Sequence, residues 1–397
     1  MRERRKTKPL GEVCTFLNGL WTGKKPPFET ALVLRNTNFR PHGRLDETDV
    51  ARLKVEAKQL SKRRLQPGDI IVEKSGGGPK QPVGRVVYFD RADGVYSFSN
   101  FTSAARVIDR RELHPEYLIK FLDWCYVSGM TERMQSHSTG IRNLDFNAYK
   151  AIDVPLPAPE EQLLIVSVID ETFSAIATAT ANAEKNLANT RELLDRAFRE
   201  RFDHVGNGWA AYRLPEISEN WDSKRRPVTK SERVPGDVPY YGASGPVDSV
   251  RDHLFDHDLL LISEDGANLL MRTYPIAFSI SGKSWVNNHA HVLKFADSAT
   301  QRLVEYYFNF ISIAPWVIGM AQPKLNQKAL NDIPIPLPPP ADRHRLVNEL
   351  DELANQIGRL EEIQRAKAAE FAALKQSTLA TVFADELTSS ARELLLA

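Results

Sequence analysis

Ile152-Asp153-Val154-Pro155-Leu156-Pro157 occurs twice in this chain, because a close copy follows 181 residues later as Ile333-Pro334-Ile335-Pro336-Leu337-Pro338. A long segment with helical spacing of apolar residues follows each copy. A repeat of this length is a duplicated domain with its connector, since solenoid units extend to only about 50 residues. The sequence therefore predicts two similar halves, and such proteins usually bind a partner or ligand that also has two similar halves.

The segments after the two copies predict two long helices, at 160–202 and 341–383. In the first, apolar or small residues recur at Ile165, Ile169, Thr172, Ile176, Ala179 and Ala183. In the second, spacings of four and three residues predict a coiled-coil seam. This seam joins Leu346, Leu350, Leu353, Ile357 and Leu360, and extends to Gln364, Lys367, Phe371 and Leu374.

One such helix would be marginal alone, because its apolar stripe needs a partner. The other long helix is the most economical partner. Packed antiparallel, the pair would form a rod of roughly 60 Å at ~1.5 Å per residue, with one globular domain at each end. This arrangement suits a target with two separated binding patches, and DNA offers half-sites about one helical turn, ~34 Å, or more apart.

The two globular parts have the mixed pattern of an α+β fold. Runs of β-branched and aromatic residues predict strands at 69–72 and 84–89, and 113–134 has the pattern of a helix. Two stretches of the first part return in the second, with Leu10–Val13 matched by Leu214–Ile217 and Asp69–Val72 by Asp258–Leu261. These offsets of 204 and 189 residues exceed 181, so the second domain is expected to be shorter.

The composition is that of a soluble globular protein, with 42% hydrophobic and 26% charged residues among 397. No uninterrupted apolar run approaches the ~18 residues that span a bilayer, and the start of the chain lacks a signal-peptide pattern. Cys14 and Cys125 give neither a disulfide framework nor a metal-ligand spacing. We expect a reduced, cytoplasmic protein without a membrane partner.

The formal charge is distributed unevenly. Residues 1–150 carry 27 Lys and Arg against 17 Asp and Glu, which gives +10, whereas residues 208–332 carry 13 against 14. A globular domain at +10 predicts a polyanion as its partner, although a solvated basic face is an alternative. The second domain has no such excess, so charge alone is not expected to explain its binding.

Three stretches resemble catalytic or metal-binding motifs, but each lacks a residue or an element that the motif requires. Lys25–Phe28 resembles a methyltransferase Asn-Pro-Pro-Phe tetrad but has Lys where the amide must bind adenine. Gly282-Lys283-Ser284 imitates the end of a phosphate-binding loop, but it continues as a strand pattern. His289 and His291 could share one strand face, without a third metal ligand at a recognisable spacing. We therefore predict no catalytic residue and no metal site.

The ordered set of motifs resembles one family, the specificity subunit of type I restriction-modification systems, over essentially the whole chain. The residues that carry the likeness are the two Pro-Leu-Pro stretches, Glu160-Glu161-Gln162, Leu65–Val72, Ser75–Gly78, Val83–Arg85 and Ser138–Leu144. The second half departs from the first in places. Ala341-Asp342-Arg343 replaces Glu160-Glu161-Gln162, and no glycine triplet follows Ser263-Glu264-Asp265-Gly266.

The resemblance implies a first target recognition domain at 1–157, a first long spacer helix at 158–205, a second recognition domain at 206–338 and a second spacer helix at 339–397. It implies a non-catalytic subunit whose two domains each recognise half of a bipartite, asymmetric site in double-stranded DNA. Two modification subunits would dock on the paired helices and methylate adenine. Restriction subunits would complete the complex. S-adenosylmethionine, ATP and Mg²⁺ would bind to those partners, and this chain would bind no cofactor.

In the first domain, the glycine-rich segment 74–82 is the strongest candidate for DNA contact, although an ordinary hairpin connection is an equally good interpretation. Glycines let backbone N–H groups approach phosphates, and Gln81 could bind an adenine edge.

The candidates here are Lys74, Ser75, Gly76, Gly77, Lys80, Gln81 and Arg85, with Trp21, Lys24 and Lys25 in a basic loop and Thr139, Arg142 and Asn143 near the end of the domain. Packing of Trp21 and helix capping by Asn143 are the commoner roles for these residue types. The candidates in the second domain are Lys224, Arg225, Lys283, Asn287, Asn288, His289, Gln322 and Lys324.

Two other classes of function remain open at this stage. A stand-alone nuclease or DNA-modifying enzyme would turn over DNA with Mg²⁺ or S-adenosylmethionine and no partner. A coiled-coil scaffold protein would bind double-stranded DNA weakly, whereas a DNA-binding subunit would lose affinity steeply as salt increases, because binding releases counterions.

The antiparallel rod generates a prediction about spacing. Deleting whole heptads from both long helices should shorten the gap between the two recognised half-sites, because the rod sets their separation, and should leave the bases of each half-site unchanged. Mapping methylated adenines in DNA exposed to the reconstituted complex measures both quantities. Altered bases at an unchanged spacing would rule out a ruler function.

Overall fold

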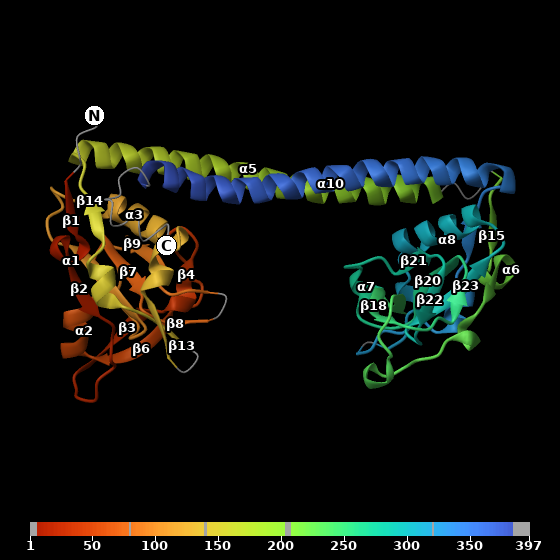
Figure 1. Ribbon diagram of the computed structural model, residues 1–397, viewed down its shortest axis with the longest axis horizontal. Coiled ribbons are helices and arrows are strands. Elements are labelled where there is room, and N and C mark those ends of the chain that lie inside the picture. The colour runs from red at the N-terminus through yellow and green to blue at the C-terminus, as the bar shows by residue number, and fades with distance from the viewer. Residues whose placement is uncertain (1–5, 79–80, 139–140, 203–207, 320, 384–397) are drawn as a thin grey trace. The chain divides into compact units, whose positions relative to one another are not determined.

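The computed structural model describes residues 6–78, 81–138, 141–202, 208–319 and 321–383. The chain divides into two units (Figure 1). Unit 1 comprises residues 1–183 together with 366–397, and unit 2 comprises residues 184–365. Each long helix therefore contributes one part to each unit, so unit 1 consists of two separate pieces of chain, whereas unit 2 is one continuous piece.

Unit 1 is built on an antiparallel sheet with strand order β2-β11-β7-β9. Its strands are β2 (Cys14–Asn18), β11 (Thr102–Val107), β7 (Asp69–Glu73) and β9 (Val86–Phe89). All five residues of β7 are buried. Ile70 and Val72 pack with the helix α3 (Pro115–Val127), whereas Ile71 packs with the opposite cluster around Leu34 and Phe98. The alternation of side chains along a strand thus gives the sheet two covered faces.

Smaller elements complete unit 1. The sheet β10-β3-β6 comprises β10 (Tyr96–Phe98), β3 (Phe28–Leu34) and β6 (Ala51–Glu56), and the sheet β12-β13-β8 comprises β12 (Gln135–Ser138), β13 (Ile141–Leu144) and β8 (Ser75–Gly77). Two strand pairs are β1 (Thr7–Pro9) with β14 (Asp153–Pro155) and β4 (Phe39–Arg40) with β5 (Arg44–Leu45). The short helices are α1 (Leu10–Val13), α2 (Ala57–Arg63) and α4 (Phe146–Lys150), with 3₁₀ turns at Asn36–Asn38 and Met130–Met134.

Unit 2 repeats this plan. Its central sheet has the order β16-β23-β20-β21, with β16 (Ser218–Asn220), β23 (Ala290–Phe295), β20 (Leu259–Ser263) and β21 (Ala277–Ile280). The helix α8 (Ser298–Phe310) packs on it as α3 does in unit 1. The second sheet has the order β18-β17-β22-β19, with β18 (Gly245–Val250), β17 (Val238–Gly242), β22 (Lys283–Val286) and β19 (Phe255–Asp256). The remaining elements are β15 (Ala210–Tyr212) paired with β24 (Ile335–Leu337), the helices α6 (Leu214–Ile217), α7 (Asn268–Met271) and α9 (Gln327–Asn331), and 3₁₀ turns at Asp222–Lys224, Lys230–Glu232 and Ala314–Trp316.

The predicted α+β duplication is confirmed for the central sheet, its covering helix and the strand pair at the Pro-Leu-Pro stretch, whereas the second sheets differ in strand order. The predicted match of Asp69–Val72 with Asp258–Leu261 is displaced by one residue, because Val72 lies opposite Ser103 and Ile262 lies opposite the equivalent His291. The two Pro-Leu-Pro stretches form equivalent strands, β14 and β24, each paired with the first strand of its domain. The matched stretches Leu10–Val13 and Leu214–Ile217 are the equivalent helices α1 and α6. The helix predicted at 113–134 is shorter than expected. It ends at Val127, because Gly129 adopts a left-handed conformation with φ of 80° and a 3₁₀ turn follows.

Both long helices are confirmed, as α5 (Pro159–Phe202) and α10 (Pro340–Phe383). In α5 the predicted apolar face is correct, since Ile169, Ile176 and Ala183 are buried. In α10 the predicted seam holds through Ile357. Beyond it, Gln364 and Phe371 are partly buried as predicted, but Leu360 and Leu374 are each 47% exposed and Lys367 is also exposed. Glu361, Ala368 and Lys375, each one residue further along the helix, are partly buried in place of the three exposed positions. An α-helix drifts by about 20° per heptad relative to a strict 3.5-residue repeat, and the buried face of α10 shifts accordingly.

By length and composition, α5 is also apolar enough to cross a membrane. One such helix is weak evidence for a membrane protein, and only 11% of its apolar stretch is buried, so burial in a core does not account for its composition. The apolar stretch is broken by Asp170 and Glu171, and Ile169 belongs to the core of unit 1.

The end of α10 is part of the core of unit 1. Phe383 is fully buried, and its ring lies 5.7 Å from that of Tyr117, 5.6 Å from Phe121 and 6.0 Å from Trp124. We predict that Phe383→Ala destabilises unit 1 by about 3–5 kcal/mol, the usual cost of truncating a buried Phe. Leu374→Ala, on an exposed position of the same helix, should cost about 0.5 kcal/mol or less. Urea denaturation with hydrogen exchange of the β7 amides measures both variants, and equal effects would contradict the docking of α10.

Candidate nucleic-acid interface

Two sequence-predicted segments of the first domain are brought together in one small sheet. Strand β13 lies between β12 and β8, with Arg142 opposite Gly77 and Asn143 opposite Ser75. The glycine-rich segment and the stretch before the end of the domain, about 65 residues apart in sequence, therefore form a single surface (Figure 1). Lys80 and Thr139, predicted as contacts on the same segments, lie outside the described residues.

Gly76 and Gly77 are needed for the shape of this surface. Gly76 has φ of 105°, a conformation that L side chains rarely adopt. A Cβ on Gly77 would lie 2.5 Å from the carbonyl oxygen of Gln81 and 2.8 Å from Val83 Cγ1. Gly78 and Gln81 exchange backbone hydrogen bonds of 3.1 Å. Glycines thus allow the backbone to fold closely on itself.

The cationic side chains of this surface differ in how far they are committed to internal partners. Arg85 forms a bidentate ion pair with the buried carboxylate of Glu73, at 2.7 and 2.8 Å, and this pairing raises the pKa of Arg85 against the opposing effect of burial. In the amide orientation that satisfies both groups, Gln81 Oε1 accepts from Arg85 at 2.7 Å. Arg142 Nη1 lies 3.1 Å from Glu132. Arg85 therefore supports the exposed Gln81, and direct phosphate contact by Arg85 or Arg142 would compete with these pairs.

Lys74 is half-buried at the edge of the same surface. Its ammonium lies 3.4 Å from Asn18 Oδ1 and 5.9 Å from the ring centroid of Phe146, and burial lowers its pKa. Trp21, Lys24 and Lys25 belong to a different loop, between β2 and β3. Trp21 is 67% exposed, so the packing interpretation of this residue is wrong. The backbone N–H groups of Lys24 and Lys25 each donate to Glu56 at 3.2 Å. These bonds fix the loop backbone, while the two lysine side chains are exposed.

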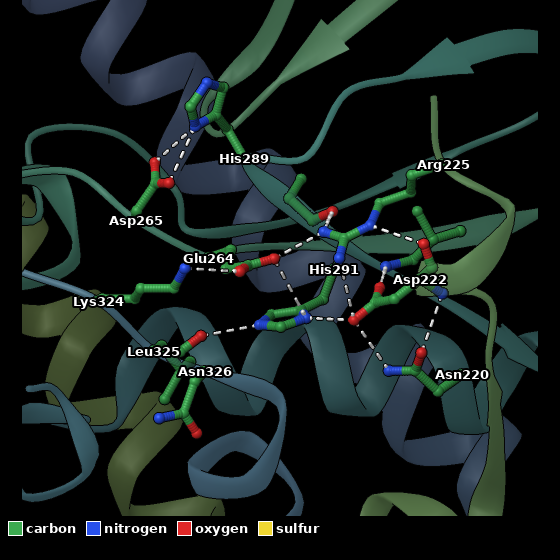
Figure 2. A network of polar contacts seen from close by, with 12 residues as sticks. Asn220, Asp222, Arg225, Glu264, Asp265, His289, His291, Lys324, Leu325 and Asn326 are labelled. Carbon is green, nitrogen blue, oxygen red and sulfur yellow. Dashed lines mark hydrogen bonds and ion pairs between the residues drawn. The ribbon is translucent and has the colours of Figure 1, made fainter. Parts of the chain in front are cut away.

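In unit 2 the structure assembles a polar network that the sequence did not predict (Figure 2). His291 on β23 is buried, with Nδ1 2.6 Å from Asp222 and Nε2 2.8 Å from the carbonyl oxygen of Leu325. Glu264, one residue beyond β20, accepts from Arg225 at 2.7 Å and from Lys324 at 3.2 Å. The network thereby joins four segments of the domain through charged groups of both signs.

The environment of the two carboxylates favours their ionised forms. Burial raises the pKa of Asp222, but the hydrogen bond and charge of His291, the Val292 N–H group and Arg225 lower it by more. Burial likewise raises the pKa of Glu264, and Arg225, His291 and Lys324 outweigh it. A carbonyl oxygen can only accept, so His291 Nε2 carries a hydrogen. Its other nitrogen, Nδ1, faces the Asp222 carboxylate.

Asp222, Glu264 and His291 are also the kinds of residue that bind metals, and their ligand atoms lie within 4.8 Å of one another. The positions next to the carboxylates are taken by Arg225 and Lys324. A metal ion would have to displace a guanidinium group and an ammonium group. The geometry is that of an ion-pair network, and it commits Arg225 and Lys324, both predicted as DNA contacts, to an internal carboxylate.

The other predicted residues of unit 2 occupy varied positions. His289 lies 2.9 Å from Asp265, and Asn287 is buried with Oδ1 accepting from the His289 N–H group. Lys224 lies over the ring of Trp221 at 3.3 Å. Lys283, Asn288 and Gln322 are exposed. Lys283 begins strand β22, so the resemblance of 282–284 to a phosphate-binding loop does not extend to the helix that such a loop requires.

Equivalent positions in the two units carry different chemistry. Leu144 N–H donates to Lys74 O at 2.8 Å, and Leu325 N–H donates to Glu264 O at 2.8 Å, which makes Lys74 the counterpart of Glu264. In unit 1 Cys14 lies opposite Val107, and in unit 2 Ser218 lies opposite Phe295. Counting along these strands makes Asn18 the counterpart of Asp222, and Ser103 the counterpart of His291. The amide, hydroxyl and ammonium groups of unit 1 are replaced by two carboxylates and an imidazole.

The comparison with protein families covers both halves. Residues 3–187 and 206–369 each match the type I restriction modification DNA specificity domain. The chain belongs to this family. A putative type I restriction enzyme specificity subunit of Haemophilus influenzae, S.HindORF215P, is 35% identical over 140 residues, which span 35% of this chain and only 36% of that protein. The StySPI specificity subunit of Salmonella potsdam is 21% identical over 97% of this chain and 90% of its own length.

Solved structures of the family share the fold. A chain from a structure that describes complex assembly and conformational transition of the type I restriction-modification system aligns with a TM-score of 0.77, at 18% identity, over 98% of this chain and 99% of its own. The HsdS subunit from Thermoanaerobacter tengcongensis aligns with a TM-score of 0.62, at 19% identity, over 98% of both chains. These likenesses show that this specificity-family member has the two-domain α+β fold with long helices.

The network in unit 2 generates a prediction about pH. Folding lowers the pKa of Asp222 and Glu264, so their contribution to stability is present above the ordinary carboxyl range, 3.8 and 4.5, and is lost as the pH falls through the lower folded values. Glu264→Gln should cost about 1–3 kcal/mol at neutral pH, because Arg225 loses its charged partner, and should flatten the fall in stability below about pH 4.5.

Hydrogen exchange of the β23 amides across a pH series measures this contribution within unit 2. Asp265→Asn is the matched control, because its pair with His289 is largely exposed, at 34% and 50%, and should contribute less than about 1 kcal/mol. If Glu264→Gln retained the full pH dependence, the network would not be the source of it.

Proposed function

We propose that this protein is the DNA-recognising subunit of a type I restriction-modification complex. Each recognition domain binds one half of a bipartite, asymmetric site in double-stranded DNA. Two modification subunits dock on the paired long helices and methylate adenine, and restriction subunits complete the assembly. S-adenosylmethionine, ATP and Mg²⁺ bind to those partners, and this chain acts as a non-catalytic cytoplasmic subunit.

The observation that carries the proposal is the agreement between two independent divisions of the chain. The family match occurs twice, at 3–187 and 206–369, and the same two halves have central sheets with equivalent strand order. The equivalent positions nevertheless carry different side chains. A duplicated scaffold with two different surfaces suits a site whose two halves have different base sequences.

The first domain has the features of a DNA-binding surface. Residues 1–150 carry a formal charge of +10. The β8–β13 surface combines closely folded glycine backbone at Gly76 and Gly77 with the exposed amide of Gln81. Backbone N–H groups and lysines would contact phosphates and position the domain, whereas an amide side chain could distinguish bases.

Reconstitution with modification subunits tests the function. The complex is expected to methylate adenine within one interrupted sequence, and sequencing of methylated DNA would identify both halves. The purified chain alone, given Mg²⁺, S-adenosylmethionine and DNA, should bind with a steep dependence on salt and should neither cleave nor methylate. Turnover by the chain alone, or methylation of an uninterrupted site, would refute the proposal.

The two adjacent glycines provide a matched pair of variants. A Cβ on Gly77 would meet backbone and side-chain atoms at 2.5 and 2.8 Å, whereas a Cβ on Gly78 would have no other atom within 4 Å. Gly77→Ala should weaken binding to the full site about tenfold or more, since local strain of about 1–3 kcal/mol corresponds to such factors. Gly78→Ala should change affinity by less than about twofold.

Binding to duplexes that are randomised in one half-site at a time assigns the effect. The loss for Gly77→Ala should be confined to discrimination in the first domain's half-site. Equal losses for Gly77→Ala and Gly78→Ala, or a loss confined to the other half-site, would show that this turn does not contact DNA as proposed.

A further inference from the structure

The connection from β20 to β21 in unit 2 corresponds to the glycine-rich segment of unit 1. Val72 pairs with Val86 at the end of β7 and β9, and Ile262 pairs with Ala277 at the end of β20 and β21. Both connections also receive the equivalent backbone hydrogen bond, from Leu144 in unit 1 and Leu325 in unit 2. The two connections therefore occupy the same place on the two scaffolds.

The chemistry of the second connection is different. It forms the short helix α7, and three of its large apolar side chains point into solvent: Leu270 is 47% exposed, Met271 72% and Tyr274 62%. We refer to Leu270, Met271 and Tyr274 as the α7 patch. Large apolar groups gathered on one short connection usually mark a binding surface, whereas single exposed apolar residues are ordinary.

The α7 patch is held in a defined conformation. Leu269 is buried beneath it, and the side-chain amide of Asn268 bonds both the N–H and the carbonyl group of Tyr274 at 3.0 Å. Arg272 adopts φ of 54°, and its guanidinium donates to the carbonyl oxygens of Phe308 and Ile311, at 2.8 and 2.6 Å, at the end of α8. Burial, side-chain hydrogen bonds and a half-buried arginine thus fix a turn whose exposed face is apolar.

The second domain has no excess of positive charge, and two of its cations are paired internally. Residues 208–332 have a formal charge of −1, and Lys324 and Arg225 are paired with Glu264. Gly266 N–H donates to Pro323 O, so the start of the α7 segment adjoins the segment that carries the predicted contacts Gln322 and Lys324. The apolar surface lies at the place that corresponds to the segment proposed to contact DNA in the first domain.

We propose that the α7 patch recognises DNA by apolar contact with the 5-methyl groups of thymine in the second half-site. This inference rests on the proposed function. In the major groove, thymine is distinguished by its methyl group, which binds apolar side chains. Met271, the most exposed of the three, and Tyr274 would make these contacts, and the rigid turn would limit the entropy lost on binding.

Replacing thymine by deoxyuridine removes only the methyl group and therefore tests the contact directly. The experiment uses the full chain in complex with modification subunits, and duplexes of the site found by methylation mapping. Deoxyuridine at one or more thymines of the second half-site should weaken binding about fourfold, because roughly one buried CH₂ group is lost. For Met271→Ala or Tyr274→Ala the same replacement should cost less than about twofold.

Several controls separate the possible outcomes. Deoxyuridine in the first half-site should affect the wild type and these variants equally, and Val234→Ala, a 44% exposed apolar residue of the same unit, should behave as the wild type. Three outcomes would overturn the inference. The second half-site could lack thymine, both variants could keep the full methyl effect, or the variants could lose modification subunits while keeping the methyl effect. A wild-type complex with no sequence-specific binding would refute the proposed function instead.

Discussion

The structure depends on the burial of each long helix in two places. In unit 1 the core contains Ile169 from α5 and Leu379 and Phe383 from α10. In unit 2 it contains Phe198 and Phe202 from α5 and Leu346 and Leu350 from α10, with the ring of Phe198 stacked 3.9 Å from that of Phe310. A helix of 44 residues with such a narrow apolar stripe gains most of its stability from packing. Because α10 is needed in unit 1, the first domain has a complete core only after nearly the whole chain has been synthesised.

This constraint explains which features of the duplication are kept. At the start of the long helices, Gln162 Nε2 donates to the Pro157 carbonyl group at 2.9 Å, and Arg343 Nε donates to the Pro338 carbonyl group at 3.1 Å. The change from Gln to Arg, a clear departure in sequence, thus keeps the same bond at the same point. The junction between recognition domain and helix is maintained because it sets where the helix begins, whereas the strand connections, which bear no comparable packing, differ.

The sequence predicted the fold well because its evidence was local or repeated. Helical spacing identified α5 and α10, and the Pro-Leu-Pro copies identified the duplication. Beyond Ile357 the predicted seam was correct at Gln364 and Phe371 and wrong at Leu360, Lys367 and Leu374, because a heptad count ignores the drift of a real helix. The approach of β13 to β8 and the network of Asp222, Glu264 and His291 could not be predicted. Both depend on strand register between segments tens of residues apart, and no short spacing encodes that register.

The backbone equivalence of the two domains allows their surfaces to differ in the sign of charge. Lys74 and Glu264 accept the same backbone hydrogen bond through their carbonyl oxygens, so the side chain can change without moving the strand ends. In unit 1 the result is a cation near polar groups. In unit 2 it is a carboxylate that binds two cations which would otherwise be available to phosphates. Main-chain hydrogen bonds fix the strand register of this scaffold but leave the connections between strands free to differ. One copy can therefore present a charged surface and the other an apolar surface. Recognition of two unlike half-sites requires such a difference.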